Sequence, residues 1–410
     1  MSTKPTARFL DRTTPPHILT LILLVGLYAL SMNIFLPSLP NMTEYFQTDY
    51  RLMQLSVALY LVVNAALQLV IGPLADRYGR RPIVLGGNIL FLLMTVGCLL
   101  APTAEIFLAF RMGQAVIVSG MVLSRAIVRD MVPGNEAASM IGYVTMFMAV
   151  VPMISPAIGG FLDGLFGWKA NFWLLLILGA AMTWLCWRDL GETATQRSGG
   201  FARQFREYPE LLTSPRFWGY SAAAAFASGA FFAYLGGAPF VGDQLFQMSP
   251  QRLGVFFGAP AVGYIFGNFL SGRYSSRIGL NTMALAGSLI CTIGPASSLT
   301  LSLLGVHSPF VFFGFMVFVG IGNGLVMPNA AAGALSVRPH LAGTASGLSG
   351  AIMIGGGAAL SAIAGALLTV ETGEYPLLWI MVLTSVAGII TMLMVIRRER
   401  RLIRSGLIEE

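Results

Sequence analysis

Twelve long apolar segments follow one another along the chain, separated by short polar or Gly/Pro-rich breaks. A helix needs roughly 20 predominantly apolar residues to cross the hydrocarbon core of a bilayer. The pattern predicts transmembrane helices at approximately 17–37, 52–74, 83–101, 105–128, 138–162, 170–187, 216–240, 252–274, 283–304, 309–330, 342–370 and 376–396. The predicted fold class is therefore an all-α polytopic membrane protein with twelve transmembrane helices.

The longest charged interruption divides these segments into six and six. We expect two six-helix bundles at 17–187 and 216–396, a central loop at 188–215, and tails at 1–16 and 397–410. The sequence GPLADRYGRR follows the second segment, and a weaker echo, GRYSSRIG, follows the eighth. Such an echo at the equivalent position indicates two parallel repeats.

Most lysines and arginines lie in the two tails or in loops on the same side as the tails. An even number of spans places both tails on one side, and short basic loops are retained in the cytoplasm. Both termini are therefore expected to be cytoplasmic, in a cell inner (plasma) membrane. The apolar run after 1–16 has full spanning length and no small-residue cleavage site, so this segment is expected to remain as a tail.

Composition agrees with a membrane protein, because 56% of the residues are hydrophobic and only 10% are charged. The formal net charge of +7 does not indicate nucleic-acid binding, since the basic residues lie between and beyond the apolar segments. Cys98, Cys186 and Cys291 lie inside apolar runs without disulfide or metal spacing. We expect no cofactor and no metal, and membrane lipid as the surroundings.

A glycine-rich charged motif follows the second segment and contains Gly72, Asp76, Arg77, Gly79, Arg80 and Arg81. The glycines permit a tight turn and a close approach of helices. The aspartate and arginines can form a hydrogen-bonded charge cluster at a helix end. The alternative is that the arginines only set topology.

This motif is similar to the signature of the major facilitator superfamily, whose fold consists of two six-helix bundles around a central cavity. In that family the Asp and the second-position Arg of the loop bind the start of helix 11 and an acidic residue at the cytoplasmic end of helix 4. The resemblance implies that Asp76, Arg80 and Asp130 form a latch that stabilises the outward-open state.

The fourth segment carries Arg111 and Gln114, in a pattern that resembles the drug-exporter branch and especially the bicyclomycin and chloramphenicol resistance (Bcr/CflA) subfamily. An arginine is costly in hydrocarbon, so Arg111 is expected to face protein or a water-filled cavity. The alternative is that its side chain snorkels to the interface.

The fifth segment resembles the antiporter motif of exporters, with a serine where a glycine is usual. Its residues are Pro152, Ser155, Pro156, Gly159 and Gly160. Prolines kink a helix and small residues let another helix pack closely. Because the motif is associated with exporters, the resemblance predicts the direction of transport; the alternative is a kinked packing helix.

The first segment departs from the subfamily, because Asn33 stands where an aspartate is usual. An amide cannot release a proton in the physiological range, and no Asp or Glu lies deep in any span. Asp163, just past the antiporter motif, is the candidate for a relocated proton site. If the proton site is not relocated, three interpretations of Asn33 remain. It binds substrate in an uncoupled carrier, or coupling occurs through the charge of the substrate itself, or Asn33 only packs helices together.

Polar side chains within the spans are the candidates for a transport cavity, because an amide in hydrocarbon needs a partner. The candidates are Asn33, Arg111, Gln114, Asn268 and Asn323. Without a deep carboxylate, we expect small lipophilic substrates that are neutral or weakly acidic, of amphenicol type.

These features predict a secondary active multidrug or antibiotic exporter that works by alternating access. Drug/proton antiport and a monomeric state are expected from the resemblance. The alternatives are an uptake carrier or uniporter for a small metabolite, and a membrane sensor that does not transport. An enzyme is not expected, because no cluster of His, Cys, Asp or Glu falls at membrane depth.

Overall fold

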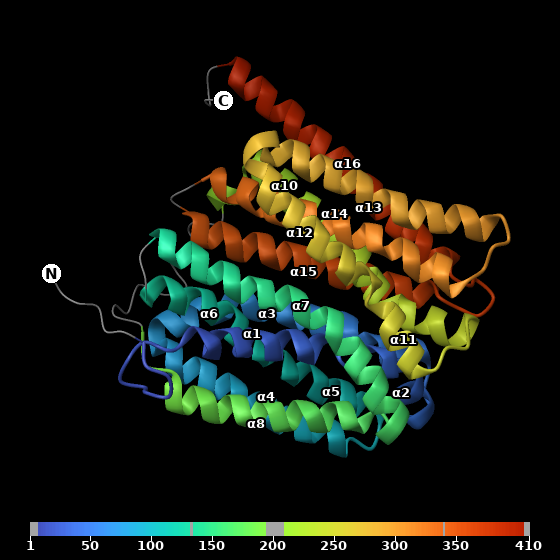
Figure 1. Ribbon diagram of the computed structural model, residues 1–410, viewed down its shortest axis with the longest axis horizontal. Coiled ribbons are helices and arrows are strands. Elements are labelled where there is room, and N and C mark those ends of the chain that lie inside the picture. The colour runs from blue at the N-terminus through green and yellow to red at the C-terminus, as the bar shows by residue number, and fades with distance from the viewer. Residues whose placement is uncertain (1–6, 132–133, 194–208, 339–340, 406–410) are drawn as a thin grey trace. The chain divides into compact units, whose positions relative to one another are not determined.

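The computed structural model describes residues 7–131, 134–193, 209–338 and 341–405. The side chains left undescribed within these ranges are those of residues 129, 134–139, 141–143, 145–150, 153, 342, 343 and 346. Every regular element in the described part is a helix (Figure 1). The chain divides into two compact units, Met1–Gln204 and Phe205–Glu410. The division lies within the segment 188–215.

The first unit is built around α1. Its helices are α1 (Ile18–Asn33), α2 (Leu39–Tyr45), α3 (Tyr50–Tyr78), α4 (Arg80–Leu100), α5 (Ala104–Gln114), α6 (Val118–Met131), α7 (Gly134–Phe166) and α8 (Lys169–Asp189), with 3₁₀ turns η1 (Leu36–Ser38) and η2 (Ala115–Ile117). Helix α1 packs against α6, α7 and α8, while α4 packs against α5 and α8.

The second unit is built around α10 and α14. Its helices are α10 (Pro215–Phe240), the π-helical turn η3 (Val241–Leu245), α11 (Pro250–Phe257), α12 (Ala259–Ile278), α13 (Leu280–Leu303), α14 (Pro309–Ser336), α15 (Ala342–Leu367) and α16 (Tyr375–Arg404). Helix α14 packs against α12, α13 and α10, and α10 packs against α15 and α16.

The all-helical membrane fold is confirmed. Among the described residues, 11 helical segments are long and apolar enough to cross a membrane. The remaining predicted span, 138–162, lies within α7, which contributes the shorter apolar segment Ile154–Phe166. Large apolar side chains such as Leu100, Phe166 and Phe310 are about three-quarters exposed, as lipid-facing residues are.

The two charged turns predicted to be echoes have the same backbone conformation. Gly79 separates α3 from α4 with φ of 103°, and Gly279 separates α12 from α13 with φ of 91°. Glycine adopts positive φ without the steric cost that a Cβ atom imposes. Each glycine therefore ends one helix and lets the next begin at once.

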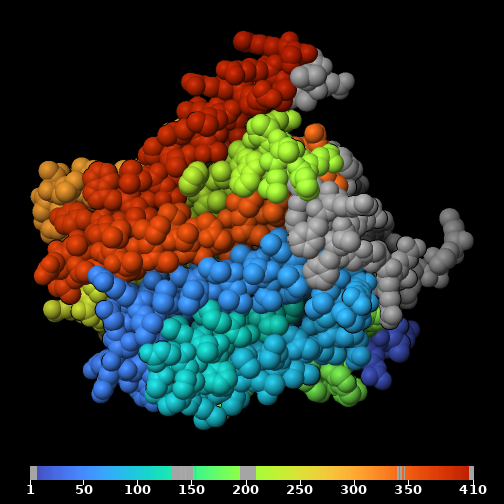
Figure 2. All heavy atoms as spheres, turned by 180° about the vertical axis from the view of Figure 1, so that it is seen from behind, coloured from blue at the N-terminus to red at the C-terminus, as the bar shows by residue number. Residues whose placement is uncertain are grey.

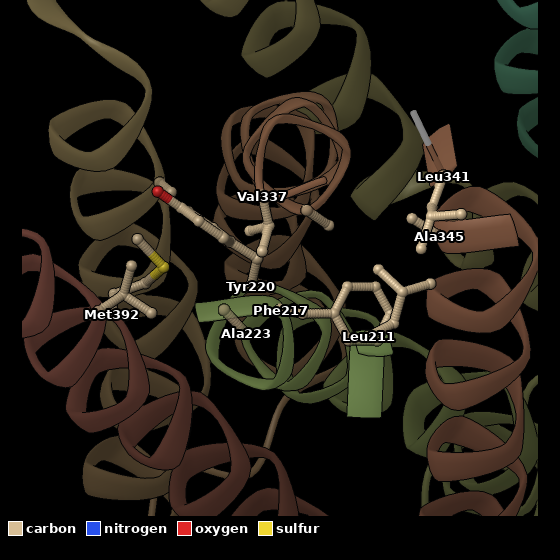
Figure 3. Packing of buried hydrophobic residues seen from close by; sticks show 11 residues of the cluster. Leu211, Phe217, Tyr220, Ala223, Val337, Leu341, Ala345 and Met392 are labelled. Atoms are coloured by element: carbon tan, nitrogen blue, oxygen red, sulfur yellow. The ribbon is translucent and has the colours of Figure 1, made fainter. Parts of the chain in front are cut away.

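One end of the second unit has a compact apolar core where α10, α14, α15 and α16 meet (Figure 3). Phe217 and Ala223 of α10 pack with Val337, Ala345 and Met392. Tyr220 belongs to the same cluster, and its hydroxyl donates a hydrogen bond to Asn281 Oδ1 at 2.8 Å. This core joins the start of α10 to the second half of α16.

Candidate functional site

Arg80 lies between two aspartates at one end of the first unit. Its Nη1 is 2.6 Å from Asp76 Oδ1, and its Nε donates to Asp130 Oδ2 at 3.3 Å. Asp76 lies at the end of α3, Arg80 begins α4, and Asp130 lies in the last turn of α6. Since one guanidinium contacts carboxylates from two other helices, it links the ends of α3, α4 and α6.

The other residues of this motif have separate roles. Arg77 is exposed and its guanidinium lies 5.3 Å from the ring centroid of Tyr78. Arg81 Nε donates to the carbonyl oxygen of Leu190 at 2.8 Å, which ties α4 to the end of α8. Gly79 supplies the turn, and Gly72 has open space where a side chain would lie.

Glu192 completes this cluster and was not predicted from the sequence. Its carboxylate accepts hydrogen bonds from the backbone N–H groups of Arg80 at 2.8 Å and Arg81 at 3.3 Å. A carboxylate at the first N–H groups of a helix satisfies donors that lack intrahelical partners and favours the helix dipole. Thr193 adds a hydrogen bond from its hydroxyl to Asp130 Oδ2 at 3.2 Å. The segment after α8 is therefore part of the charge cluster.

Asp189 is a second acidic residue that the sequence reasoning assigned to the central loop. It is fully buried and accepts hydrogen bonds from Leu10 N at 2.7 Å, His17 N at 2.9 Å and Thr20 Oγ1 at 2.6 Å. These contacts tie the chain before α1 to the end of α8. In the same amino-terminal segment, the hydroxyl and backbone N–H of Thr13 hold the pKa of Asp11 below its usual value.

Arg111 is completely buried inside the first unit. Its guanidinium lies between the rings of Phe35 and Tyr60, 4.4 and 4.0 Å from their centroids. Its Nη2 donates to the carbonyl oxygen of Ser31 at 2.9 Å, and its Nη1 donates to Gln114 Oε1 at 2.8 Å. Within the described part of the chain, none of its contacts is with a carboxylate. Cation–π contacts and dipoles therefore stabilise this buried charge.

The antiporter-like motif packs directly on α1. A methyl group on Gly159 would overlap the carbonyl oxygen of Ile34, so the two backbones touch. Ser155 is buried one turn earlier, and its hydroxyl has no hydrogen-bond partner among the described residues. Pro152 and Pro156 lie inside α7, where each removes a backbone donor. Gly160 is also buried.

Asn33 immediately precedes the residue that Gly159 contacts. It is buried, and its Nδ2 donates to the carbonyl oxygen of Ala29 in its own helix at 2.7 Å. This hydrogen bond lies within α1 and does not join two helices.

Asp163 lies one turn beyond Gly159, at the opposite end of the unit from Arg80. It is only 4% exposed, and its Oδ2 accepts a hydrogen bond from Asn41 Nδ2 at 2.9 Å. Its Oδ1 is buried without a hydrogen-bond partner among the residues that the structure describes. Asp163 is therefore a buried carboxyl group close to the contact between α7 and the end of α1.

The remaining predicted cavity residues are Gln114 in the first unit and Asn268 and Asn323 in the second unit. Gln114 joins Arg111 to Thr95, since its Nε2 donates to Thr95 Oγ1 at 2.7 Å. In the second unit, Asn323 Nδ2 donates to the carbonyl oxygen of Ala227 in α10 at 3.0 Å. Asn268 bonds the carbonyl oxygen of Tyr264 in its own helix. Asn33, Arg111 and Gln114 all belong to the first unit, and Asn268 and Asn323 to the second.

The fold and these polar clusters define a polytopic α-helical membrane protein with two units of spanning helices. Residues 21–362 match the family model described as "Major Facilitator Superfamily". The chain therefore belongs to the major facilitator superfamily of membrane transporters, in the drug-efflux branch that holds chloramphenicol and bicyclomycin resistance proteins of the Bcr/CflA subfamily.

Individual proteins agree with this assignment. A Bacillus subtilis protein, the uncharacterized MFS-type transporter YdgK, is 31% identical over 390 residues, covering 92% of this chain and 96% of its own. A chloramphenicol resistance protein of Pseudomonas aeruginosa is 32% identical over 326 residues, which cover 78% of this chain and 76% of that protein. The crystal structure of a D-xylose-proton symporter superposes with a TM-score of 0.74 at 16% identity, covering 92% of this chain and 96% of that one, and shows the shared fold.

Proposed function

We propose that this transporter is a secondary active exporter of small lipophilic compounds, including antibiotics, that are neutral or weakly charged. The observation that carries the proposal is the backbone contact between Gly159 of the antiporter-like motif and Ile34, the residue directly after α1. It supports a tightly fitted α1–α7 pair of the kind that the exporter motif implies. The chloramphenicol resistance relative, which matches most of the chain, supports the substrate class.

The mechanism we propose is alternating access, in which the two units rock about a central site. The cluster of Asp76, Arg80 and Asp130 closes the cytoplasmic side in one state. Most arginines lie in the two tails or in the loops on the same side of the membrane as the tails. Since short basic loops stay in the cytoplasm, this supports cytoplasmic termini in an inner membrane. The protein acts as a monomer in this scheme.

Breaking this charge cluster is expected to slow turnover without weakening substrate binding. Asp76→Asn removes one ion pair of the latch and Arg80→Gln removes both. The transport rate should fall at least about tenfold, as a change of about 1.4 kcal/mol in a barrier produces. Initial transport rates in vesicles and equilibrium binding to purified protein measure the two effects. Arg77→Gln is the matched control, because Arg77 lies in the same last turn of α3 as Asp76 but its guanidinium contacts the ring of Tyr78. Equal rates in all variants would remove the latch from the mechanism.

We place proton coupling at Asp163. A proton-exchange site needs a carboxyl group that is costly to ionise in one state and reaches water in another. Asp163 is nearly completely buried, holds one hydrogen bond from Asn41, and lies next to the α1–α7 contact. A movement of α7 against α1 would therefore change its exposure.

Asp163→Asn is expected to abolish gradient-driven accumulation of a neutral amphenicol in inverted vesicles. The amide keeps the shape and can still bond Asn41, but it cannot carry a proton. Accumulation with and without an imposed proton gradient is measured for both proteins. Glu44→Gln is the control, because Glu44 is an exposed carboxylate on the same helix as Asn41.

The same measurement separates the alternatives. Gradient-independent transport by the wild type would indicate an uncoupled carrier with Asn33 as a substrate ligand. Gradient-driven depletion of substrate from the inverted vesicles would indicate uptake of a small metabolite instead of export.

A further inference from the structure

The last helix is longer than the hydrocarbon core of the membrane is thick. Helix α16 has 30 residues, or about 45 Å at 1.5 Å per residue, whereas the hydrocarbon core spans about 30 Å. In Figure 1 its red end continues beyond the other helices of its unit. Trp379 near its start is 48% exposed, and Arg397 follows after about 27 Å of helix, close to the hydrocarbon thickness. The part from Arg397 onward therefore emerges at the headgroup level.

This emerging part has one strongly basic face. Its basic residues are Arg397, Arg398, Arg400, Arg401 and Arg404, and all are exposed. At 100° per residue they fall within an arc of about 160°. The exposed apolar residues of the preceding turns, Ile390, Leu393 and Met394, fall within the same arc. One continuous strip thus changes from apolar to basic where the helix leaves the membrane.

Within the described helix from Arg397 to Arg404, the one acidic residue is Glu399, which lies on the opposite face and is already engaged. Its Oε1 accepts a hydrogen bond from Arg216 Nη2 at 2.8 Å, and its Oε2 accepts one from Asn281 Nδ2. Among the described residues, the five exposed arginines form no ion pair. No carboxylate of the described residues therefore neutralises these five charges.

The neighbouring helix places an aromatic anchor at the same level. The Arg216–Glu399 pair holds the start of α10 beside the end of α16, seen as yellow-green beside red in Figure 2. Trp218, in the first turn of α10, is 43% exposed. Tryptophan prefers the membrane–water interface, so the basic strip and this ring lie in one headgroup layer.

We propose that the basic strip of α16 is a binding surface for the phosphate groups of anionic phospholipids. An arginine fork binds phosphate oxygens in a bidentate manner. Clusters of four to eight basic residues directly after a transmembrane helix attract anionic leaflets. The apolar part of the same strip contacts the acyl chains of the lipid whose headgroup the arginines bind. This surface does not depend on the transported substrate.

The test is native mass spectrometry of the purified full-length protein from micelles that contain equal amounts of phosphatidylglycerol and phosphatidylcholine. The wild type is expected to retain phosphatidylglycerol in preference. Replacing all five arginines with glutamine should lower that retention at least about tenfold. Replacing them with lysine should preserve most of it, since the charge and the topology signal remain.

Arg273→Gln with Arg277→Gln is the matched control, because both arginines are exposed at the end of α12. This control should retain phosphatidylglycerol like the wild type. Equal retention by the fivefold glutamine variant would overturn the proposal. The proposal would also be overturned if the preference of the wild type for phosphatidylglycerol did not weaken between about 0.05 and 0.5 M salt, because contacts with phosphate are strongly screened over this range. This salt measurement is the deciding test if the glutamine variant does not fold.

Discussion

Gly159→Ala is expected to lower both the stability of the protein and its transport rate severely. The new methyl group would overlap the carbonyl oxygen of Ile34, a backbone atom at the end of α1 that cannot rotate away like a side chain. Helices α1 and α7 would have to separate, with loss of the Asn171 hydrogen bonds to Gly159 O and Ser38 Oγ that tie α7 and η1 to α8. Forcing extra atoms into a packed core typically costs about 1–3 kcal/mol, and contact with a fixed backbone places this variant at the upper end.

Thermal unfolding in detergent and transport of an amphenicol in vesicles measure the two effects. Gly86→Ala is the control, because Gly86 lies in the interior of α4 with no atom near its would-be side chain. That variant should be as stable as the wild type or up to about 1 kcal/mol more stable, since alanine favours a helix over glycine. A Gly159→Ala protein that unfolds and transports like Gly86→Ala would show that the helices separate at no cost.

Apolar length predicted the positions of the helices closely, because the bilayer imposes one minimum span on every helix. The expected span 170–187 corresponds to α8, Lys169–Asp189. The expected span 105–128 is instead α5, a 3₁₀ turn and α6. Hydropathy does not distinguish such a turn from continuous helix, since its residues, Ala115–Ile117, are equally apolar.

Contacts made after a helix ends were not predictable in the same way. Asp189 and Glu192 lie in a polar stretch with no periodicity, and their partners are backbone N–H groups of distant segments. Backbone donors carry no signal in the sequence. An available clue was two acidic residues at the end of a spanning helix and just beyond it, on the side where other helices begin. Helix N-termini attract carboxylates.

Arg111 illustrates the opposite case, in which the chemistry was evident and the surroundings were not. The cost of a buried charge predicted that its side chain faces protein or water. The structure places it between two aromatic rings, and Phe35 and Tyr60 come from segments far from it in sequence. Only the three-dimensional packing brings those rings together.

Arg111→Met is therefore expected to separate function from stability. Replacing buried charged groups with apolar side chains of similar volume is often neutral or stabilising when no uncompensated charge remains, and none of the described contacts of Arg111 is with a carboxylate. The melting temperature should not fall, because methionine fills the space between the rings while Gln114 keeps its bond to Thr95. If the charge serves transport, the rate should fall about a hundredfold, which corresponds to about 2.7 kcal/mol in the barrier.

Arg111→Lys distinguishes charge from geometry. Lysine keeps the positive charge but lacks the planar fork that stacks on two rings and bonds both Ser31 and Gln114. An intermediate transport rate is therefore expected, again measured in vesicles beside the melting temperature. Arg51→Gln, an exposed arginine in the first turn of α3, is the control and should behave as the wild type. Full transport by Arg111→Met would mean that this buried cation only packs the first unit.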